Sequence, residues 1–502
     1  MTQRFFRSFI VGFVLATAWP SLVLGQPVKW PSSSPPRPLP AHEARFPPYQ
    51  VKTLPNGMSV VVVVHTEQPA VSVRLILRAG GAQDPAGKSG LAAMVATLLD
   101  QGTATRTAQQ VADTIDSAGG RLETGAGRDL SFANVTVMKD SLDLGIGLLA
   151  DVVRCPAFAQ EELDRQRRQV VAALRVSYQD PAYVANVVFD RLVYGLHPYG
   201  FPRNGTPESV ETLTREDLVQ FHRRHYAPNN SILAVVGDLT VDEAMAAVTK
   251  AFGDWPRQEI PADPVAELPK PAKRIVVLDK PDAVQTEIRM GQIGIPRKNG
   301  DFMAVDLAIK ILGGEGANRL HRVLRTERGL TYSASAGFDV LKKSGEFVAQ
   351  TNTRSDATAE VLGLMMEEFW RLRRDRVNDV ELSDAKAYLT GHFPLTIETP
   401  DEIATQILDV LFYELPVEEL QTFRQRVNAV GVDDVERVAA KYLQPDRLSV
   451  VLVGNSATFL GQLKRVGFKS VDVIRLSDLD LTAPDFTRKN LADAAAKTGR
   501  RP

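Results

Sequence analysis

The stretch Ser89-Gly90-Leu91-Ala92-Ala93-Met94-Val95-Ala96-Thr97-Leu98-Leu99-Asp100-Gln101-Gly102-Thr103 is predicted to form one helix with two different faces. Ser89 is suited to the N-cap and Gly102 to the C-terminal stop. Large apolar residues recur at i, i+3, i+4, i+7 and i+8, the spacing of a face that packs into a core: Leu91, Met94, Val95, Leu98 and Leu99. The other face carries short side chains: Ala93, Ala96, Thr97 and Asp100.

The pattern G-L-A-x-x-x-x-x-x-L-x-x-G-T within this stretch resembles the first-helix signature of the pitrilysin/insulinase-like zinc peptidases, bacterial two-subunit type. Their H-x-x-E-H motif places two histidines on zinc and a glutamate that activates the metal-bound water. The resemblance puts the histidine positions at Ala93 and Thr97 and the glutamate position at Ala96. Because alanine offers no donor atom and a threonine hydroxyl is a poor zinc ligand, we expect no metal in this chain.

The same family takes its third zinc ligand, a glutamate in a V-x-E-E-like run, from a long charged helix. The corresponding helix is predicted from Glu161 to about Tyr178, and it ends at Asp180-Pro181. The matching residues are Val170-Val171-Ala172-Ala173, so the resemblance implies that this ligand is missing too. Further on, His197-Pro198-Tyr199-Gly200 resembles the family's H-P-Y-G segment, and we interpret it as a structural turn.

A motif in the second half keeps the residue types of the family. The segment from Asn318 to Ser333 resembles R-L-x-x-x-L-R-x-x-x-G-L-x-Y-S of pitrilysin-like C-terminal domains, and its Arg/Tyr pair falls on Arg325 and Tyr332. In the family this pair lies across the chamber from the zinc and is taken to hold the substrate backbone and polarise the carbonyl under attack. A guanidinium and a phenol both donate hydrogen bonds to an oxygen that gains negative charge. We assign Arg325 and Tyr332 to substrate binding; the alternative is a pair that merely follows from the fold.

Other candidate residues receive structural interpretations. His222 and His225 lie three apart on a predicted helix, but no further ligand follows at metal-binding spacing, which favours a solvated helix face. Cys155 is the only cysteine, so an internal disulfide is excluded, and its apolar neighbours favour a buried structural thiol. With 59 basic and 60 acidic residues, the chain shows no charge excess for a nucleic-acid partner.

The N-terminus is predicted to direct export. Residues 1–25 place Arg4 and Arg7 before a short apolar run, as in a secretory signal peptide; the alternative is an uncleaved membrane anchor. Residues 26–48 are rich in proline and serine and indicate a linker. Export without disulfides suits a bacterial periplasm, so we expect a periplasmic or secreted protein without a later membrane span.

The remainder divides into two similar halves. We predict an N-terminal domain at 49–255, a Pro-rich linker at 256–271, a C-terminal domain at 272–482 and a flexible tail at 483–502. Pro228 precedes Gly237 by nine positions, as Pro445 precedes Gly454, which indicates an internal duplication. The predicted fold is α+β, with two homologous halves, each a mainly antiparallel sheet with helices on one face. The resemblance implies that these halves enclose a peptide-binding chamber.

Together these features favour a non-catalytic subunit of an exported zinc endopeptidase. The resemblance implies that it binds extended peptides and completes, with Arg325 and Tyr332, the site of a homologous partner that carries H-x-x-E-H and the zinc. No cofactor is expected in this chain. The alternative is an inert scaffold or peptide-binding protein of the same fold. A lone hydrolase has little support because no G-x-S-x-G motif is present.

Overall fold

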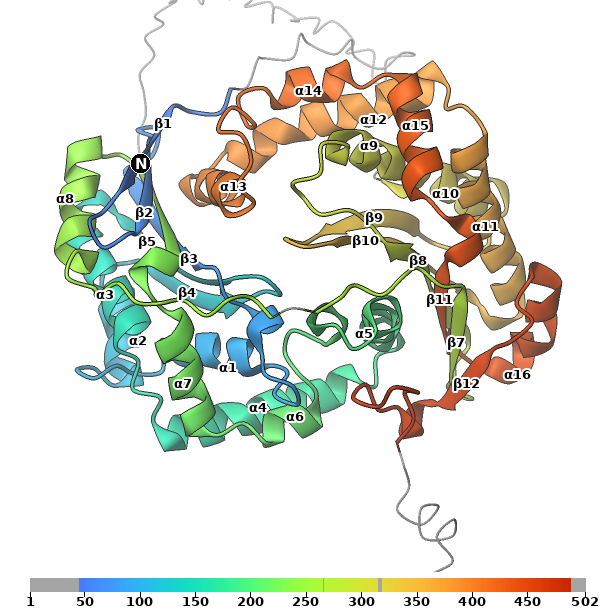
Figure 1. Cartoon of the computed structure of the whole chain (residues 1–502), viewed down its shortest axis with the longest axis horizontal. Helices are drawn as coiled ribbons and strands as arrows, with labels where there is room; N and C mark the ends of the chain where they lie inside the picture. The colour runs from blue at the N-terminus through green and yellow to red at the C-terminus, as the bar shows by residue number, and fades with distance from the viewer. Residues whose placement is uncertain (1–44, 265, 315–317, 489–502) are drawn as a thin grey trace, which may run out of the picture. The chain divides into compact units, whose positions relative to one another are not determined.

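The valine-rich runs of the first half form a six-stranded sheet in the order β1-β2-β6-β3-β5-β4 (Figure 1). All neighbouring pairs are antiparallel except β2 and β6, which are parallel. Alternation along each strand sends one set of side chains, including Val60, Val62 and Val73, into a core beneath helices. The strands are β1 (Tyr49–Thr53), β2 (Ser59–Val64), β3 (Ala70–Leu77), β4 (Arg121–Ala126), β5 (Ser131–Met138) and β6 (Ser231–Gly237).

A second six-stranded sheet has the order β12-β7-β11-β8-β10-β9. Five strands of each sheet occur in the same chain order and the same positions, and the parallel pair β7–β11 corresponds to β2–β6. Gly237 and Gly454 end the equivalent strands β6 and β11. This computed structural model therefore confirms the predicted α+β fold of two similar halves. The strands are β7 (Arg274–Asp279), β8 (Gln285–Ile293), β9 (Ala334–Val340), β10 (Gly345–Arg354), β11 (Ser449–Gly454) and β12 (Asp472–Arg475).

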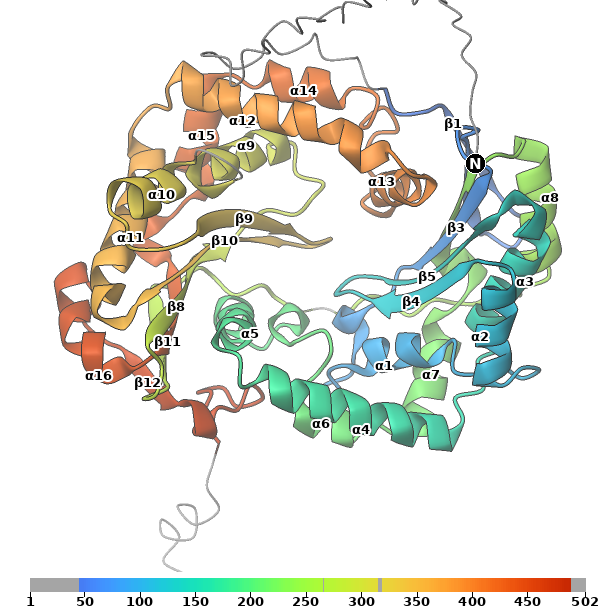
Figure 2. The ribbon, with the colours of Figure 1, turned by 180° about the vertical axis from the view of Figure 1, so that it is seen from behind.

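Helices pack on each sheet, most of them in the core of their own half (Figures 1 and 2). In the first half they are α1 (Leu91–Leu98), α2 (Ala108–Ser117), α3 (Leu142–Arg154), α4 (Gln160–Ser177), α5 (Pro181–Tyr194), α6 (Pro207–Glu211), α7 (Arg215–His225) and α8 (Val241–Phe252). In the second half they are α9 (Phe302–Gly313), α10 (Arg319–His321), α11 (Thr358–Arg374), α12 (Asp379–His392), α13 (Pro400–Phe412), α14 (Phe423–Ala429), α15 (Val432–Tyr442) and α16 (Ser456–Phe459).

The second face of each sheet receives one helix from the other half. Helix α5 packs against β8 and β11, with Val184 and Val188 buried among Val451 and Val453. In the same way, α13 packs against β3 and β6, where Ile407 is buried. The two helices hold equivalent places in the duplicated chain order, so the halves exchange one helix each.

The structure describes residues 45–264, 266–314 and 318–488. The predicted signal peptide, nearly all of the Pro-rich linker at 26–48 and the end of the predicted tail lie outside the described residues. Within the described ranges, no helix is long and apolar enough to cross a bilayer. The junction at 256–264 and 266–273 carries neither helix nor strand.

Candidate functional site

Helix α1 begins one residue later than the sequence indicates. Its N-cap is Gly90, in the left-handed conformation at φ 91°, while the Ser89 hydroxyl donates to the Pro202 carbonyl at 3.1 Å. The cap is replaced by Asp84, whose carboxylate accepts from the Gly90 and Ala92 backbone N–H groups, both at 2.8 Å. Burial raises the pKa of Asp84 to about 7, although the α1 backbone N–H groups act to lower it.

The positions that carry the zinc ligands in the resembled family lie around a hollow between α1 and α4. Ala93 and Thr97 line it from α1, and Ala173 lines it from α4; its volume is about 230 Å³. The Thr97 hydroxyl donates to the Ala93 carbonyl at 2.8 Å, a bond within the helix. The third residue of the degenerate motif, Ala96, is fully buried and packs into the core.

These residues do not fit a zinc ion. Ala93 and Ala173 have no ligating atom, and the Thr97 hydroxyl is turned to its own helix. Asp100, one turn further on, accepts from the Gln101 amide at 2.6 Å, and burial raises its pKa. Over the described ranges, no group of three or more His, Cys, Asp or Glu side chains could hold a metal ion.

Arg325 lies on an unusual helical turn. Asn318 caps α10 by accepting from the His321 N–H at 2.8 Å, and the helix continues as a π-helical segment over Arg322–Glu327. Gly329 then ends it at φ 61°, a conformation that other residues adopt only with strain. Single π-helical turns are rare and occur frequently at functional sites.

The structure brings the two predicted substrate-binding residues together. One guanidinium nitrogen of Arg325 donates to the Tyr332 backbone carbonyl at 2.5 Å, and the guanidinium carbon lies 4.4 Å from the centre of the Tyr332 ring. The Tyr332 side chain is nevertheless 78% exposed. Arg325 and Tyr332 therefore contact each other, and Tyr332 remains exposed to solvent.

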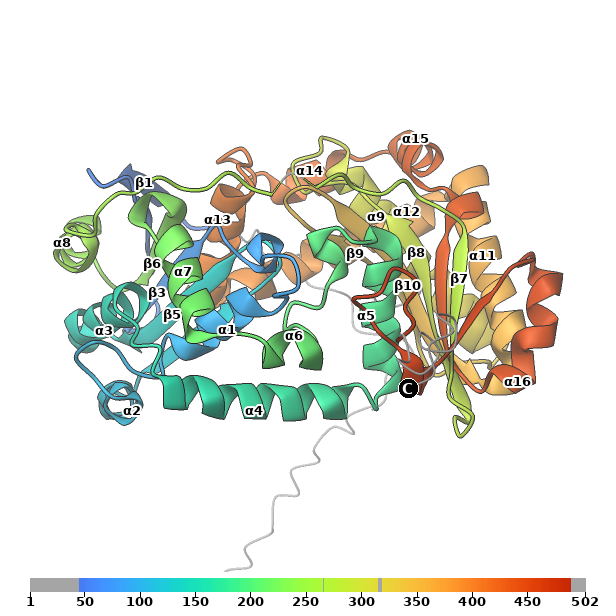
Figure 3. The same cartoon turned by 60° about the horizontal axis from the view of Figure 1, so that its bottom comes forward.

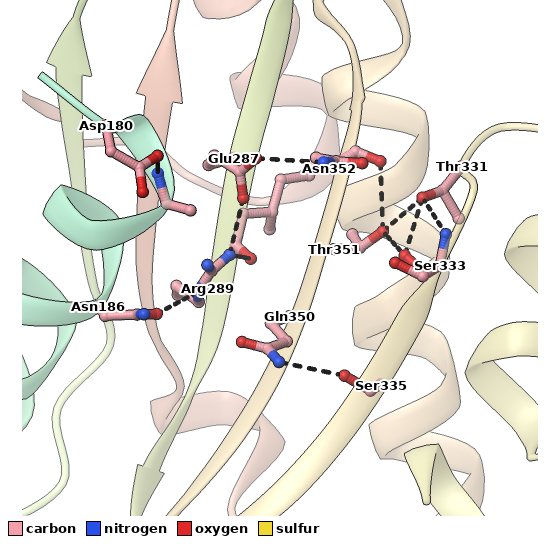
Figure 4. A network of polar contacts seen from close by, with 12 residues as sticks. Asp180, Asn186, Glu287, Arg289, Thr331, Ser333, Ser335, Gln350, Thr351 and Asn352 are labelled. Atoms are coloured by element: carbon pink, nitrogen blue, oxygen red, sulfur yellow. Dashed lines mark hydrogen bonds and ion pairs between the residues drawn. The ribbon is translucent and has the colours of Figure 1, made fainter. Parts of the chain in front are cut away.

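The segment on either side of Tyr332 is fastened to β10 (Figure 4). The Thr351 hydroxyl lies 2.9 Å from the Thr331 hydroxyl and 2.7 Å from the Ser333 carbonyl oxygen. Two residues further along β10, the buried Thr353 hydroxyl donates to the Leu330 carbonyl at 2.7 Å. These bonds fix the backbone before and after Tyr332. No helix or strand pattern in the sequence marks them.

A second polar chain crosses the opposite face of the same sheet (Figure 4). The Asn352 amide donates to Glu287 at 3.2 Å, and Arg289 donates to Glu287 at 3.1 Å and to Asn186 of α5 at 2.6 Å. The sheet that carries the Tyr332 segment is thereby tied to a helix of the first half.

The first half offers a free strand edge on β4, a strand that packs against α1. β4 is the outer strand of its sheet and pairs with β5 only, within the part of the chain that the structure describes. Helix α1 packs against β4. The outward backbone groups of such a strand are a template for pairing with another extended chain.

The structure corrects two interpretations of single residues. His225 is 8% exposed, and the His222 Nε2 atom lies 2.8 Å from the Val153 carbonyl oxygen with its ring stacked on Tyr226, so neither histidine is on a solvated face. Burial lowers the pKa of His222 to about 4. Cys155 is exposed, because it follows the last residue of α3 and leaves the core face.

The H-P-Y-G segment forms a turn that joins the halves. The Tyr199 phenol donates to Asp129 at 2.5 Å, and the other Asp129 oxygen accepts from the backbone N–H of Lys342 at 2.7 Å. Lys342 lies in the turn between β9 and β10. The turn interpretation stands, and the structure adds that this turn supports the contact between the two sheets.

Two similar α+β halves, each built on a six-stranded sheet with helices, define the fold class of this chain. Two family models agree with this class: residues 60–195 match the model described as insulinase (peptidase family M16), and residues 212–389 match the model described as peptidase M16 inactive domain. Together they match more than half of the chain. The chain belongs to the insulinase family of peptidases, family M16.

Similar proteins span most of the chain. It is 28% identical over 400 residues to an uncharacterized zinc protease of Mycobacterium leprae, which covers 78% of this chain and 88% of that protein. The structure of a peptidase M16 inactive domain from Pseudomonas fluorescens matches with a TM-score of 0.77 and 29% identity, covering 81% and 98%. A chain of Complex III2 from Candida albicans has the same fold, with a TM-score of 0.70, 16% identity and coverage of 83% and 98%.

Proposed function

We propose that this chain is the non-catalytic subunit of an exported zinc endopeptidase, which binds extended peptides and completes the active site of a homologous partner. The partner would supply the zinc and the general base, since the equivalent positions here are Ala93, Ala96 and Thr97. The observation that supports this proposal is that Arg325 and Tyr332 contact each other while Tyr332 remains exposed to solvent.

The exposure of Tyr332 favours a binding role over a structural one. A tyrosine that only filled space in the sheet would be buried, whereas Tyr332 is 78% exposed on a backbone segment that Thr351 and Thr353 hold in place. Because the segment is already ordered, little conformational entropy is lost when the phenol meets a ligand. Preorganised donors are the kind that stabilise developing charge in a transition state.

The peptide itself would pair with the free edge of β4. An extended substrate that adds to this edge gains main-chain hydrogen bonds whatever its sequence. Such binding selects for extended or unfolded chains, because a folded segment has no free backbone groups to offer. The rival function, a scaffold or peptide-binding protein without a catalytic role, needs the same edge but not the donors of Arg325 and Tyr332.

The test compares the purified chain with the complex it forms with a homologous H-x-x-E-H subunit. We expect no peptide hydrolysis by the chain alone and turnover by the complex. Arg325→Ala or Tyr332→Phe should lower kcat of the complex about 100-fold, because each removes one donor to the developing charge. Arg328→Ala, an exposed arginine one turn from Arg325, is the matched control and should leave kcat unchanged. Undiminished turnover by the double variant would favour the scaffold.

A further inference from the structure

The hollow between α1 and α4, which we call the α1–α4 hollow, has walls from three helices and one loop. Figure 3 shows the ribbons of α1, α4 and α5, the helices that carry these walls. Its volume is about 230 Å³. The lining residues are Gly90, Ala93, Met94 and Thr97 from the start and body of α1, Val170, Ala173, Leu174 and Ser177 from α4, Tyr183 from α5 and Asn204 from the following loop.

The lining is uncharged. None of the described residues that line the hollow is Asp, Glu, Lys, Arg or His. Its two aliphatic hydroxyls are engaged with their own helices, since Thr97 donates to the Ala93 carbonyl at 2.8 Å and Ser177 donates to the Ala173 carbonyl at 3.0 Å. Tyr183 and Asn204 add a phenol and an amide, so the lining is uncharged and its larger part is apolar. A charged group entering the hollow would lose hydration without an oppositely charged partner in the lining.

The size of the hollow suits a single side chain. An apolar protein cavity of roughly 150 Å³ accepts benzene, so about 230 Å³ is ample for one aromatic or branched aliphatic group. Sites for whole cofactors or drug-sized ligands are larger, at roughly 300–1,000 Å³. Because Ala173 and Asn204 are exposed, the hollow opens to the surface rather than lying inside the core.

The position of the hollow relates it to the peptide. Helix α1 packs against the free-edge strand β4 and also against α4. A peptide paired with β4 runs beside α1, and side chains alternate along an extended chain. One side chain of the bound peptide can point toward Ala93 and Thr97. Because these two residues are short, they leave the hollow open, whereas longer side chains at these positions would fill it.

We propose that the α1–α4 hollow is a specificity pocket that receives one uncharged apolar side chain of the extended peptide. This inference rests on the proposed peptide-binding function and names the substrate feature that the chain selects. Loss of the metal ligands thus leaves a recognition site in place of a reaction centre.

Two variants of one helix separate the pocket from its surroundings. Ala173→Leu adds three carbon atoms in the wall of the hollow, whereas Ala172→Leu adds the same atoms at a neighbouring exposed position of α4 outside it. Both positions are exposed and leucine is a good helix former, so both variants should fold as the parent does. Equal circular dichroism and Tm values check this.

The first measurement uses peptides of one design, fluorescein-labelled Gly-Thr-Ser-Thr-Xaa-Thr-Ser-Thr-Gly, with Phe, Leu, Asp or Gly at Xaa, bound to the full chain and followed by anisotropy. The Phe and Leu peptides should bind about tenfold more tightly than the Gly and Asp peptides, in line with burial of one apolar side chain. Ala173→Leu should abolish the preference, and Ala172→Leu should retain it.

The second measurement tests the hollow without a peptide. Toluene, the side-chain analogue of phenylalanine, should show saturation-transfer NMR signals with the parent chain and Ala172→Leu, and much weaker signals with Ala173→Leu. If peptides bind without any preference at Xaa, the pocket is refuted while peptide binding stands. If no peptide binds, the proposed peptide-binding function fails, and the toluene measurement alone tests whether the hollow is an apolar pocket. Equal toluene signals from Ala173→Leu and Ala172→Leu would then refute the pocket.

Discussion

At the scale of single residues, the proposed substrate-binding pair, Arg325 and Tyr332, depends on two threonines of β10. Thr351 holds Thr331 and Ser333, which flank Tyr332, and Thr353 holds Leu330. Thr351 therefore acts as a positioning residue: it fixes the backbone from which the phenol projects. The Arg325 guanidinium adds a bond to the Tyr332 carbonyl, so the same segment is held on two sides.

Removal of the Thr351 hydroxyl should loosen the backbone around Tyr332 while leaving the Arg325 guanidinium and the Tyr332 phenol in place. Thr351→Val leaves the Ser333 carbonyl and the Thr331 hydroxyl without this partner, and we expect kcat of the complex to fall about tenfold with little change in KM. Loss of one net hydrogen bond costs about 1 kcal/mol of stability, which a urea titration measures. Thr351→Ser restores the hydroxyl and should restore kcat; failure of this rescue would argue against the positioning role.

At the scale of elements, the exchange of α5 and α13 decides how the halves hold together. Each helix buries apolar side chains on the sheet of the other half, so each sheet has helices on both faces. Ile407 of α13 is fully buried against strands that include Ile232 and Val236 of β6. A change in the second half should therefore loosen the first.

Ile407→Ala tests this coupling. Truncation of a fully buried isoleucine costs about 2–5 kcal/mol, and the loss should appear as faster hydrogen exchange in β6. Val435→Ala is the control: this valine is equally buried, in α15, but packs in the core of its own half. Its exchange effect should fall on the second sheet, and equal loss of β6 protection in both variants would contradict the coupling.

At the scale of the whole molecule, a buried acidic cluster lies where the halves meet. Arg128 of the first half forms ion pairs with Asp190 of α5 and, at 3.1 Å, with Asp339 of β9. Glu346 of β10 is 4% exposed beside them, with Tyr194 nearby. Burial, together with repulsion from Asp190, raises the pKa of Glu346 well above its usual range, and burial also raises the pKa of Asp190.

Raised carboxyl pKa values set the sign of a pH effect. In the folded chain Glu346 and Asp190 keep protons that the same carboxyl groups release in the unfolded chain. Their protonation therefore contributes to folding stability in full below about pH 4, and this contribution is lost as pH rises through their raised pKa values in the folded chain. Glu346→Gln removes one of the titrating groups and should raise Tm by roughly 2–4 °C at pH 8, with a smaller effect at pH 5. Differential scanning calorimetry across this range measures it.

A glutamate elsewhere serves as the control for this titration. Glu161→Gln, on the exposed first turn of α4, removes the same charge from a solvated position and should change Tm little at any of these pH values. If Glu346→Gln lowered Tm at pH 8, the buried carboxylate would be stabilising the contact between the halves, which is the opposite of what its raised pKa implies.

Much of the fold could be predicted from the sequence because it depends on patterns formed by residues close together in the chain. The apolar periodicity of α1 and the repeated Pro-to-Gly spacing that ends β6 and β11 depend only on neighbouring residues. The start of α1 could not be predicted, because its cap comes from Asp84, six residues before Gly90. The prediction for His222 and His225 is wrong for a similar reason: burial is a property of what packs against a helix, not of its own spacing.

By itself the sequence determined the duplicated α+β plan and the absence of ligating side chains at Ala93, Ala96 and Thr97, and it pointed to Arg325 and Tyr332 as candidate substrate-binding residues. Only the tertiary structure showed that Arg325 and Tyr332 contact each other at the surface and that α5 and α13 each pack on the sheet of the other half. It also showed the uncharged hollow between α1 and α4. The reason is physical: composition and period record what each residue can do, whereas contacts between distant segments fix what it meets.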